Sequence, residues 1–273
     1  MSLAVHDSSY VRTLVRERSA IVLDEGKEYL LESRLAPIVR REHLDSIGDL
    51  VGQLRSQPFG DLHARVVEAM TTNETSFFRD AHPFEALQDH VVPELIERRA
   101  DERRLRIWCA ACSSGQEPYS VAMLLRDRFP ELQSWDVEIL GTDLSTEMLE
   151  RARDGAYTTL EVNRGLPARQ LVQSFEQAGP MWRLKAPLRE MAEFRVMNLI
   201  EPWPLLPKMD VVFMRNVLIY FDTETKQDIL AQVRRVLRPD GSLFLGASET
   251  TLNLDPAFER VAYGRASCYR VRS

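Results

Sequence analysis

The sequence predicts a doubly wound α/β domain that follows a small all-α domain and carries an inserted antiparallel β-subdomain. Three observations lead to this fold class. The first 70 or so residues place apolar side chains at helical spacing and lack the alternating runs typical of strands. Beyond about residue 105, short apolar segments alternate with amphipathic ones, as in parallel strands joined by helices. A segment with several Gly and Pro residues, 157–192, interrupts this alternation. We therefore expect an all-α domain over 1–75 and an α/β domain over 76–273, with 157–192 as the insert.

The N-terminal part reads as several short helices. Apolar residues recur three or four positions apart at Tyr10, Val11, Leu14 and Val15, and again at Leu30, Leu31, Leu35, Ile38 and Val39. Residues 46–49 are a plausible turn into another helix that passes through Leu50 and Leu54. The charged stretch 94–104 is expected to be a helix or linker that leads to the second part.

The second part alternates between strands and helices. Strands are predicted at 105–111, 136–142, 193–198, 209–214 and 242–246, and helices at about 118–128, 145–154 and 223–237. Ser145 is a good N-cap, and residues 238–241, Arg-Pro-Asp-Gly, should close the last helix. Two final runs, 259–263 and 266–271, should pair as a hairpin around Gly264. Within the insert, residues 181–185 alternate as in a small antiparallel unit.

Composition narrows the functional classes. The 273 residues include 35 basic and 41 acidic side chains, for a net charge of −6. A non-specific nucleic-acid binder needs a basic footprint, so this balance argues against that class. No apolar run approaches the roughly 20 residues that cross a bilayer, and no secretory signal is visible. We expect a cytoplasmic protein without direct membrane insertion.

The cysteines and histidines do not suggest a metal site. Cys109 and Cys112 form a C-x-x-C, but no second pair or nearby histidine accompanies them. A redox pair is a somewhat better interpretation, although the flanking residues resemble the end of a buried strand. The five histidines lie in the first 90 residues without ligand spacing. We expect no bound metal.

Two acidic residues follow the first two predicted strands, where α/β sheets bind ligands. Glu117 lies near the turn 111–115, where it could bind an ammonium or hydroxyl, or act as a first-turn acid of the next helix. Asp143 ends the second strand, where it could accept the hydroxyls of an adenosine ribose or help to start the following helix. The turn lacks the second and third glycines of G-x-G-x-x-G, so a nicotinamide dinucleotide is a poor fit. A nucleoside without phosphates, such as S-adenosylmethionine, needs no such loop.

A further polar motif, residues 215–220, follows the strand 209–214. Asn216 is expected to bond a ligand or the backbone, because a polar group among apolar neighbours needs a partner. Tyr220 could lie near a reacting centre or pack as an aromatic with its hydroxyl at the surface. The motif is not Asn-Pro-Pro-Tyr, which argues against a nucleic-acid base as methyl acceptor. Upstream, the run 71–79 reads as a helix cap with two core phenylalanines.

Four segments together resemble the CheR-type chemotaxis receptor (protein-glutamate) methyltransferases. They are Thr-Thr-Asn-Glu-Thr-Ser-Phe-Phe-Arg at 71–79, Ala-Ala-Cys-Ser-Ser-Gly-Gln-Glu-Pro-Tyr-Ser at 110–120, Gly-Thr-Asp at 141–143 and Arg-Asn-Val-Leu-Ile-Tyr-Phe at 215–221. The segments occur in order and the resemblance covers nearly the whole chain.

The resemblance implies a Rossmann-like methyltransferase domain and a reaction. The enzyme would transfer a methyl group from S-adenosyl-L-methionine to glutamates in the cytoplasmic helical region of chemoreceptors, leaving S-adenosyl-L-homocysteine and serving sensory adaptation. The implied cofactor contacts are Asn73, Thr75, Arg79, Glu117, Asp143, Asn198, Leu199, Arg215 and Asn216. Tyr220 is implied as the catalytic tyrosine near the transferred methyl. The alternative is a non-catalytic receptor-binding scaffold that retains the fold.

Two departures from the family pattern are visible. Gln116 stands where many relatives have glutamate, but Glu117 is retained. The insert around residues 179–180 is shorter than in relatives whose β-subdomain binds a receptor C-terminal pentapeptide, and it lacks their glycine-rich turn. We therefore expect an enzyme that acts independently of that tether. We also expect a monomer.

A stripe of basic residues is the expected substrate-docking surface. Lys27, Arg34 and Arg41 are spaced by seven residues, and a helix drifts by only about 20° per heptad. They would share one face if the helix continues through Pro37. The alternative is a solvated charged face, because Glu25, Glu28, Glu32 and Glu42 lie nearby.

Overall fold

The computed structural model describes residues 4–24 and 26–272, and the chain divides into two compact units. The helical unit comprises the chain up to Thr72 together with Tyr220–Thr225. The sheet unit comprises Asn73–Ile219 and the chain from Lys226 onward. The predicted combination of an all-α part with an α/β part that carries a second small sheet is confirmed.

Within its described residues, the helical unit contains four helices, each of which buries an apolar stripe. They are α1 (Val5–Ser19), α2 (Glu28–Arg41), α3 (Ile47–Ser56) and α4 (Asp61–Ala69). Buried side chains three or four residues apart, such as Leu31, Leu35 and Ile38 of α2, form the core. Ser46 caps α3 by accepting a hydrogen bond from the Asp49 amide at 3.1 Å. Helix α2 continues through Pro37, as the predicted basic stripe required.

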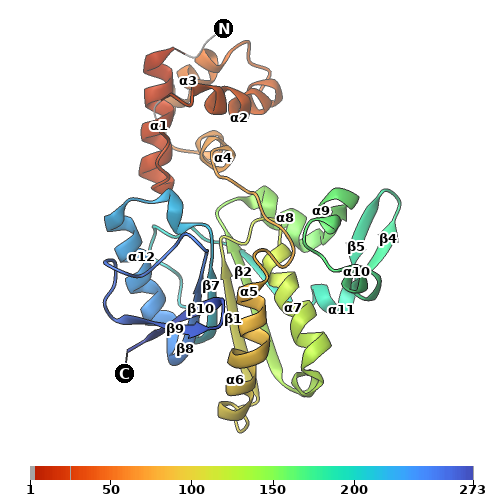
Figure 1. Ribbon diagram of the computed structural model, residues 1–273. Coiled ribbons are helices and arrows are strands. Elements are labelled where there is room, and N and C mark those ends of the chain that lie inside the picture. The colour runs from red at the N-terminus through yellow and green to blue at the C-terminus, as the bar shows by residue number, and fades with distance from the viewer. Residues whose placement is uncertain (1–3, 25, 273) are drawn as a thin grey trace. The chain divides into compact units, whose positions relative to one another are not determined.

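The sheet unit is built on a seven-stranded sheet of order β6-β2-β1-β7-β8-β10-β9 (Figure 1). The strands are β1 (Arg104–Ala110), β2 (Asp136–Asp143), β6 (Ala192–Val196), β7 (Met209–Met214), β8 (Leu237–Leu245), β9 (Phe258–Tyr263) and β10 (Ala266–Val271). The first five run parallel to one another, whereas β10 pairs antiparallel with β8 and β9. The predicted C-terminal hairpin is therefore present.

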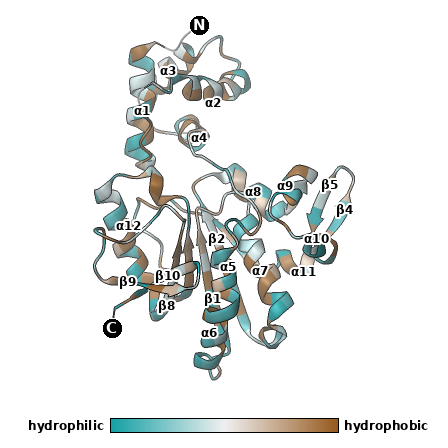
Figure 2. Cartoon of the chain, viewed as in Figure 1, coloured by the Kyte–Doolittle hydropathy of each residue, from teal (hydrophilic) through white to brown (hydrophobic). Residues whose placement is uncertain are grey.

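Helices cover this sheet and bury a continuous core. They include α5 (His82–Ala86), a π-helical turn (Leu87–Val91), α6 (Val92–Arg98), α7 (Gln116–Arg128), α8 (Thr146–Asp154) and α12 (Thr223–Val236). Short 3₁₀ turns occur at Pro130–Ser134 and Leu218–Tyr220. Strand β7 is buried along its whole length, and its Phe213 stacks on Phe244 of β8 with centroids 4.8 Å apart. Strands buried on both faces are mostly apolar, and the inner strands are mainly hydrophobic in Figure 2.

The segment Arg-Pro-Asp-Gly at 238–241 does not close a helix, which corrects the prediction. Helix α12 ends at Val236, and β8 begins at the next residue. Leu237 pairs with Met209 and Ser242 pairs with Val211, so the intervening residues form a bulge in the β7–β8 ladder. Turn-forming residues are tolerated in a bulge because the ladder is already interrupted there.

The predicted insert contains a three-stranded antiparallel sheet of order β3-β5-β4. Its strands are β3 (Ala156–Thr158), β4 (Phe175–Ala178) and β5 (Met181–Leu184), and its helices are α9 (Thr159–Asn163), α10 (Ala168–Ser174) and α11 (Ala186–Arg189). Only Gly179 and Pro180 connect β4 to β5, and the hairpin is mainly hydrophilic (Figure 2). Phe77 anchors the insert through edge-on contacts with Tyr157 and Phe175.

Candidate cofactor-binding site

The predicted site residues of the sheet unit lie at the carboxyl edge of the parallel strands. Strand β1 has β2 and β6 on one side and β7 and β8 on the other, so the strand order reverses beside it. Asp143 ends β2, whereas Glu117, Asn198 and Arg215 follow β1, β6 and β7, respectively. Ligands of open α/β sheets bind at this reversal.

Asp143 joins the first two turns of this edge. Its carboxylate accepts hydrogen bonds from the amides of Ser113, at 2.8 Å, and Ser145, at 2.9 Å. The Ser113 hydroxyl in turn donates to the Asn73 carbonyl at 2.9 Å. The bond from Ser145, which caps α8, agrees with the interpretation of Asp143 as a helix-starting residue. The network also places Asn73 beside the same turn.

The buried Arg215 side chain pairs with two carboxylates, of which that of Asp80 is partly exposed. Its guanidinium donates to Glu117 and to Asp80, each at 2.8 Å, and to the Arg79 carbonyl at 2.7 Å. Only 2 % of the Arg215 side chain is exposed. Burial raises the pKa of Glu117, and the positive charge of Arg215 opposes this rise. Among the described residues, the buried Nε–H of Arg215 has no hydrogen-bond partner.

Asn198 and Leu199 reach the site through the backbone. The Met197 amide donates to the Asp143 carbonyl at 2.9 Å, which fixes the chain after β6 beside the end of β2. Leu199 is buried, and its carbonyl accepts a hydrogen bond from the Trp203 indole at 3.2 Å. Trp203 packs edge-on against Trp108 of β1.

The run 71–79 combines core and site residues. Phe77 is fully buried in the main core, and Phe78 packs against it while its amide donates to the Ser120 hydroxyl at 2.9 Å. The two phenylalanines are therefore core residues, as one interpretation of the sequence proposed. Thr75 is half-buried between them and Asn73. At the start of the run, the Thr71 amide and hydroxyl donate to the Glu68 carbonyl in the last turn of α4, at 3.0 and 2.6 Å. Residues 77–80 form a turn before α5 begins at His82.

The remaining predicted residues lie in the helical unit. Tyr220 is half-buried, and its carbonyl accepts a hydrogen bond from the Val22 amide at 3.1 Å. Lys27 precedes α2 and pairs with Asp24 at 2.6 Å, so the basic stripe on the helix itself comprises Arg34 and Arg41. Arg34 donates to the Met70 carbonyl at 2.5 Å and to Thr72 at 3.0 Å, whereas Arg41 is exposed.

Sequence reasoning missed two acidic residues at the site. Asp80 pairs with Arg215, and Glu249 accepts hydrogen bonds from the backbone after β7. Asp80 directly follows the motif at 71–79, so its position in the sequence could have identified it as a candidate site residue. Glu249 lies 33 positions from Asn216, and nothing in the local sequence connects them.

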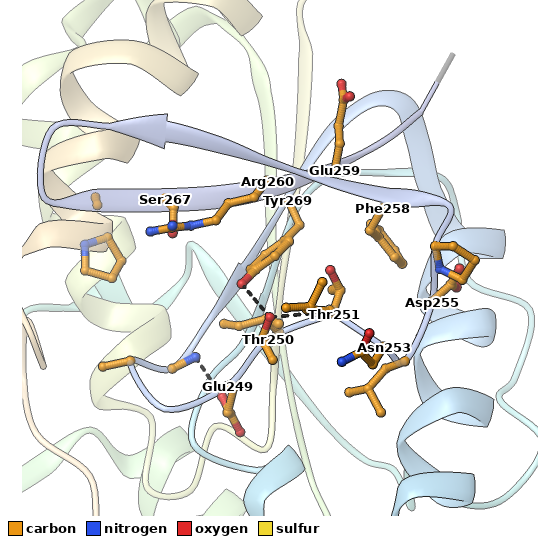
Figure 3. A pocket seen from close by; sticks show the side chains of 18 of the residues that line it. Glu249, Thr250, Thr251, Asn253, Asp255, Phe258, Glu259, Arg260, Ser267 and Tyr269 are labelled. Carbon is orange, nitrogen blue, oxygen red and sulfur yellow. Dashed lines mark hydrogen bonds between the residues drawn. The ribbon is translucent and has the colours of Figure 1, made fainter.

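A cavity of about 1110 Å³ adjoins these two residues. Asp80, Glu249, the β8–β9 connection and both strands of the C-terminal hairpin line it, and Arg260 and Tyr269 project into the same region (Figure 3). Tyr269 contacts Thr250 across the cavity wall, with 3.4 Å between their hydroxyl oxygens.

The cysteines are buried free thiols, and burial raises the pKa values of Cys109 and Cys112. Among residues 4–24 and 26–272, no three His, Cys, Asp or Glu side chains are grouped as metal ligands would be. Within the same ranges, no helix has the length and apolar character needed to span a membrane.

The chain matches known proteins along its whole length. Residues 7–71 match the all-alpha domain of the CheR methyltransferases, and residues 73–266 match their SAM binding domain. The chain belongs to the CheR methyltransferase family. It is 44 % identical to chemotaxis protein methyltransferase 1 of Pseudomonas aeruginosa, and the alignment covers 100 % of both chains. It is 36 % identical to the chemotaxis protein methyltransferase of Escherichia coli, over 94 % of this chain and 89 % of the relative.

The residues present fit S-adenosylmethionine, the cofactor of this S-adenosylmethionine-dependent methyltransferase. The ligand carries ribose hydroxyls, an ammonium and a carboxylate but no phosphate. Asp143 ends β2 and Glu117 lies in the first turn of α7, which follows β1. Their carboxylates suit hydroxyl and ammonium donors. The unpartnered Nε–H of Arg215 suits an anionic acceptor.

Proposed function

We propose that this methyltransferase modifies glutamate side chains in the cytoplasmic helical region of chemoreceptors and forms methyl esters that serve sensory adaptation. The support is the full-length similarity to proteins named chemotaxis protein methyltransferases in Pseudomonas aeruginosa, Pseudomonas putida and Escherichia coli. The proposal includes action in the cytoplasm, as a monomer, without nucleic acid.

The observation that carries the proposal is the convergence of the four sequence motifs on one edge of the sheet. The motif at 110–120 supplies Glu117, which bonds Arg215 of the motif at 215–221. Arg215 also bonds the Arg79 carbonyl of the motif at 71–79, and Ser113 connects Asp143 to Asn73. In this proposal, the cofactor contacts are Asn73, Thr75, Arg79, Glu117, Asp143, Asn198, Leu199, Arg215 and Asn216.

The proposed methyl transfer needs little acid–base catalysis by the protein. When bound, S-adenosylmethionine supplies a methyl group activated by its sulfonium. A glutamate acceptor is already ionised at neutral pH, so the protein need not remove a proton. Its residues must exclude water and align the acceptor with the methyl group. Alignment alone can accelerate such a reaction. Tyr220 is proposed to position the acceptor or the methyl group.

The acceptor is proposed to dock on α2 and to need no C-terminal tether. Arg34 and Arg41 lie on one face of α2, and Lys27 precedes the helix. These cations suit acidic receptor helices. The β4–β5 hairpin has only the two-residue connection Gly179-Pro180, which supports the expected independence from a receptor pentapeptide.

Transfer of labelled methyl from S-adenosylmethionine to a panel of receptor signalling domains tests the proposal. We expect base-labile label on glutamate residues, with equal rates for receptors with and without their C-terminal pentapeptide. Binding of S-adenosylhomocysteine and receptor without transfer to any domain would instead support a scaffold. A strong dependence on the pentapeptide would overturn the proposed independence alone.

A further inference from the structure

The Glu249 carboxylate accepts hydrogen bonds from four backbone amides in two separate segments. Its Oε2 accepts hydrogen bonds from Asn216 at 2.7 Å and Gly246 at 2.6 Å, and its Oε1 accepts from Val217 at 2.9 Å and Ile219 at 3.3 Å. Three of these donors belong to the loop 215–219, which follows β7 and runs into the 3₁₀ turn Leu218–Tyr220. Buried amides without an acceptor are costly, so this carboxylate replaces the partners that a strand or helix would supply.

The loop held in this way contains a residue in the left-handed region, which asparagine adopts more readily than most other non-glycine residues. Asn216 has a φ of 60°, in the left-handed region that non-glycine residues seldom adopt. Such a conformation persists only where the surroundings determine it strongly. The Glu249 carboxylate accepts hydrogen bonds from the amides of Asn216 and of Val217, the next residue. It therefore fixes the backbone on both sides of Asn216.

Gly246 shows how closely the two segments approach. A Cβ at this position would lie 2.7 Å from Oε2 of Glu249 and 2.9 Å from the Asn216 amide nitrogen. Only glycine leaves room for the carboxylate and the loop to meet there. Figure 3 shows Glu249 on the wall of the cavity, with its bond to the backbone at the end of β8. The contact is therefore a tight three-part junction of Glu249, Gly246 and the loop.

From this junction we infer that Glu249 is a positioning residue for cofactor binding, which acts by holding Asn216 in its left-handed conformation. The inference rests on the proposed role of Asn216 as a cofactor contact. Glu249 does not need to touch the ligand. It affects ligand affinity by positioning Asn216. A residue that only stabilised the fold would not show this dependence on Asn216.

A double-mutant cycle tests this coupling through binding of S-adenosylhomocysteine measured by calorimetry. Glu249→Gln keeps the side-chain size but turns one acceptor oxygen into a donor that faces backbone amides. We expect Glu249→Gln and Asn216→Ala each to weaken binding by about tenfold, the effect of one hydrogen bond in a buried site. The double variant should bind no more weakly than the weaker-binding single variant. Multiplicative losses, near a hundredfold together, would overturn the inference, as would unchanged binding in Glu249→Gln.

Two controls keep the outcome interpretable. Glu161 also accepts a backbone amide, that of Thr158 at 2.9 Å, but it lies in the insert, so Glu161→Gln should leave affinity unchanged. Gly246→Ala displaces the loop from the other side and should show the same coupling to Asn216 if Glu249→Gln does not fold. A wild-type chain that failed to bind S-adenosylhomocysteine would refute the proposed cofactor site itself. This outcome is distinct from multiplicative losses of affinity in the double variant.

Discussion

At the end of β2, Asp143 combines a structural contact with a proposed ligand contact. Its carboxylate accepts the amides of Ser113 and Ser145, so it organises the turns after β1 and β2. Asp143→Ala should weaken binding of S-adenosylhomocysteine by roughly 1–3 kcal/mol, because ligand hydroxyls lose their acceptor. The same change should lower the melting temperature, because two amides also lose theirs. Calorimetry on the folded variant measures the first effect, and unchanged affinity would remove Asp143 from the binding site.

The pH dependence of cofactor affinity should report on Glu117. Burial raises its pKa above the usual value of about 4.3 for glutamate, despite the neighbouring Arg215. Protonation removes the negative charge that a ligand ammonium needs, so affinity should fall as the pH decreases through the raised pKa. Because the folded-state pKa is raised, the contribution of Glu117 to stability is present below the unfolded pKa and is lost as the pH rises through the folded value.

The comparison for this titration is Glu117→Gln. It should bind S-adenosylhomocysteine more weakly at neutral pH and lose the dependence on pH in that window. Calorimetry across the acidic range gives both curves. Parallel curves for wild type and variant would show that another group titrates.

Tyr220→Phe separates positioning from packing. The change removes one hydroxyl from a half-buried side chain. If the hydroxyl positions the methyl or the acceptor, turnover should fall while S-adenosylhomocysteine affinity and melting temperature barely change. Equal turnover in steady-state assays would identify Tyr220 as a packing residue.

At the scale of elements, α2 carries the proposed receptor contact. Arg34 is partly committed to the helical unit, because it bonds the Met70 carbonyl and Thr72. Its reversal would therefore disturb folding as well as docking. Arg41 is exposed near the end of the same face and gives the cleaner test.

Arg41→Glu should raise the KM for receptor at low ionic strength, chiefly through slower association, and leave cofactor affinity unchanged. Arg40→Glu is the matched control, since the neighbouring residue is also exposed but points about 100° away around the helix. Equal receptor kinetics for Arg41→Glu and wild type at low salt would identify the stripe as a solvated face.

At the scale of the whole molecule, a buried ion pair joins the amino ends of the central strands to α6. The Arg99 guanidinium donates to Asp210 at 2.8 Å and to Asp240 at 2.6 Å, and Asp210 also accepts the Arg106 amide. These contacts connect β1, β7 and the bulge of β8 at the edge opposite the site.

Asp210→Asn should lower the free energy of unfolding by about 1–3 kcal/mol, because the buried Arg99 guanidinium loses one of its two carboxylate partners and keeps only Asp240. Denaturant titration measures the change. Asp136→Asn is the control, because it breaks an ion pair with Arg104 that is half exposed, and its effect should be small. Similar losses in the two variants would contradict the special role of the buried pair.

The sequence by itself determined the elements whose signals are local. Helical spacing identified the N-terminal helices, Ser145 marked a helix start, and Asp143 could be placed at a strand end. Residues 46–49 were expected to form a turn, whereas Ser46 caps α3 and the helix begins at Ile47. These features follow from periodicity and capping over a few residues, and tertiary contacts only reinforced them. The four motifs likewise predicted the family, because long matched segments are specific.

Only the tertiary structure decided which distant residues meet. Residues 238–241 have the composition of a turn, but pairing with β7 draws them into a bulge of β8. Glu249 acquires its role because the ends of β7 and β8 lie side by side, which brings its carboxylate onto amides 30 or more positions away. Local sequence encodes the propensity of each segment, whereas these contacts depend on how the strands order themselves in the sheet. Packing across the sheet thus selects partners that no short-range pattern can specify.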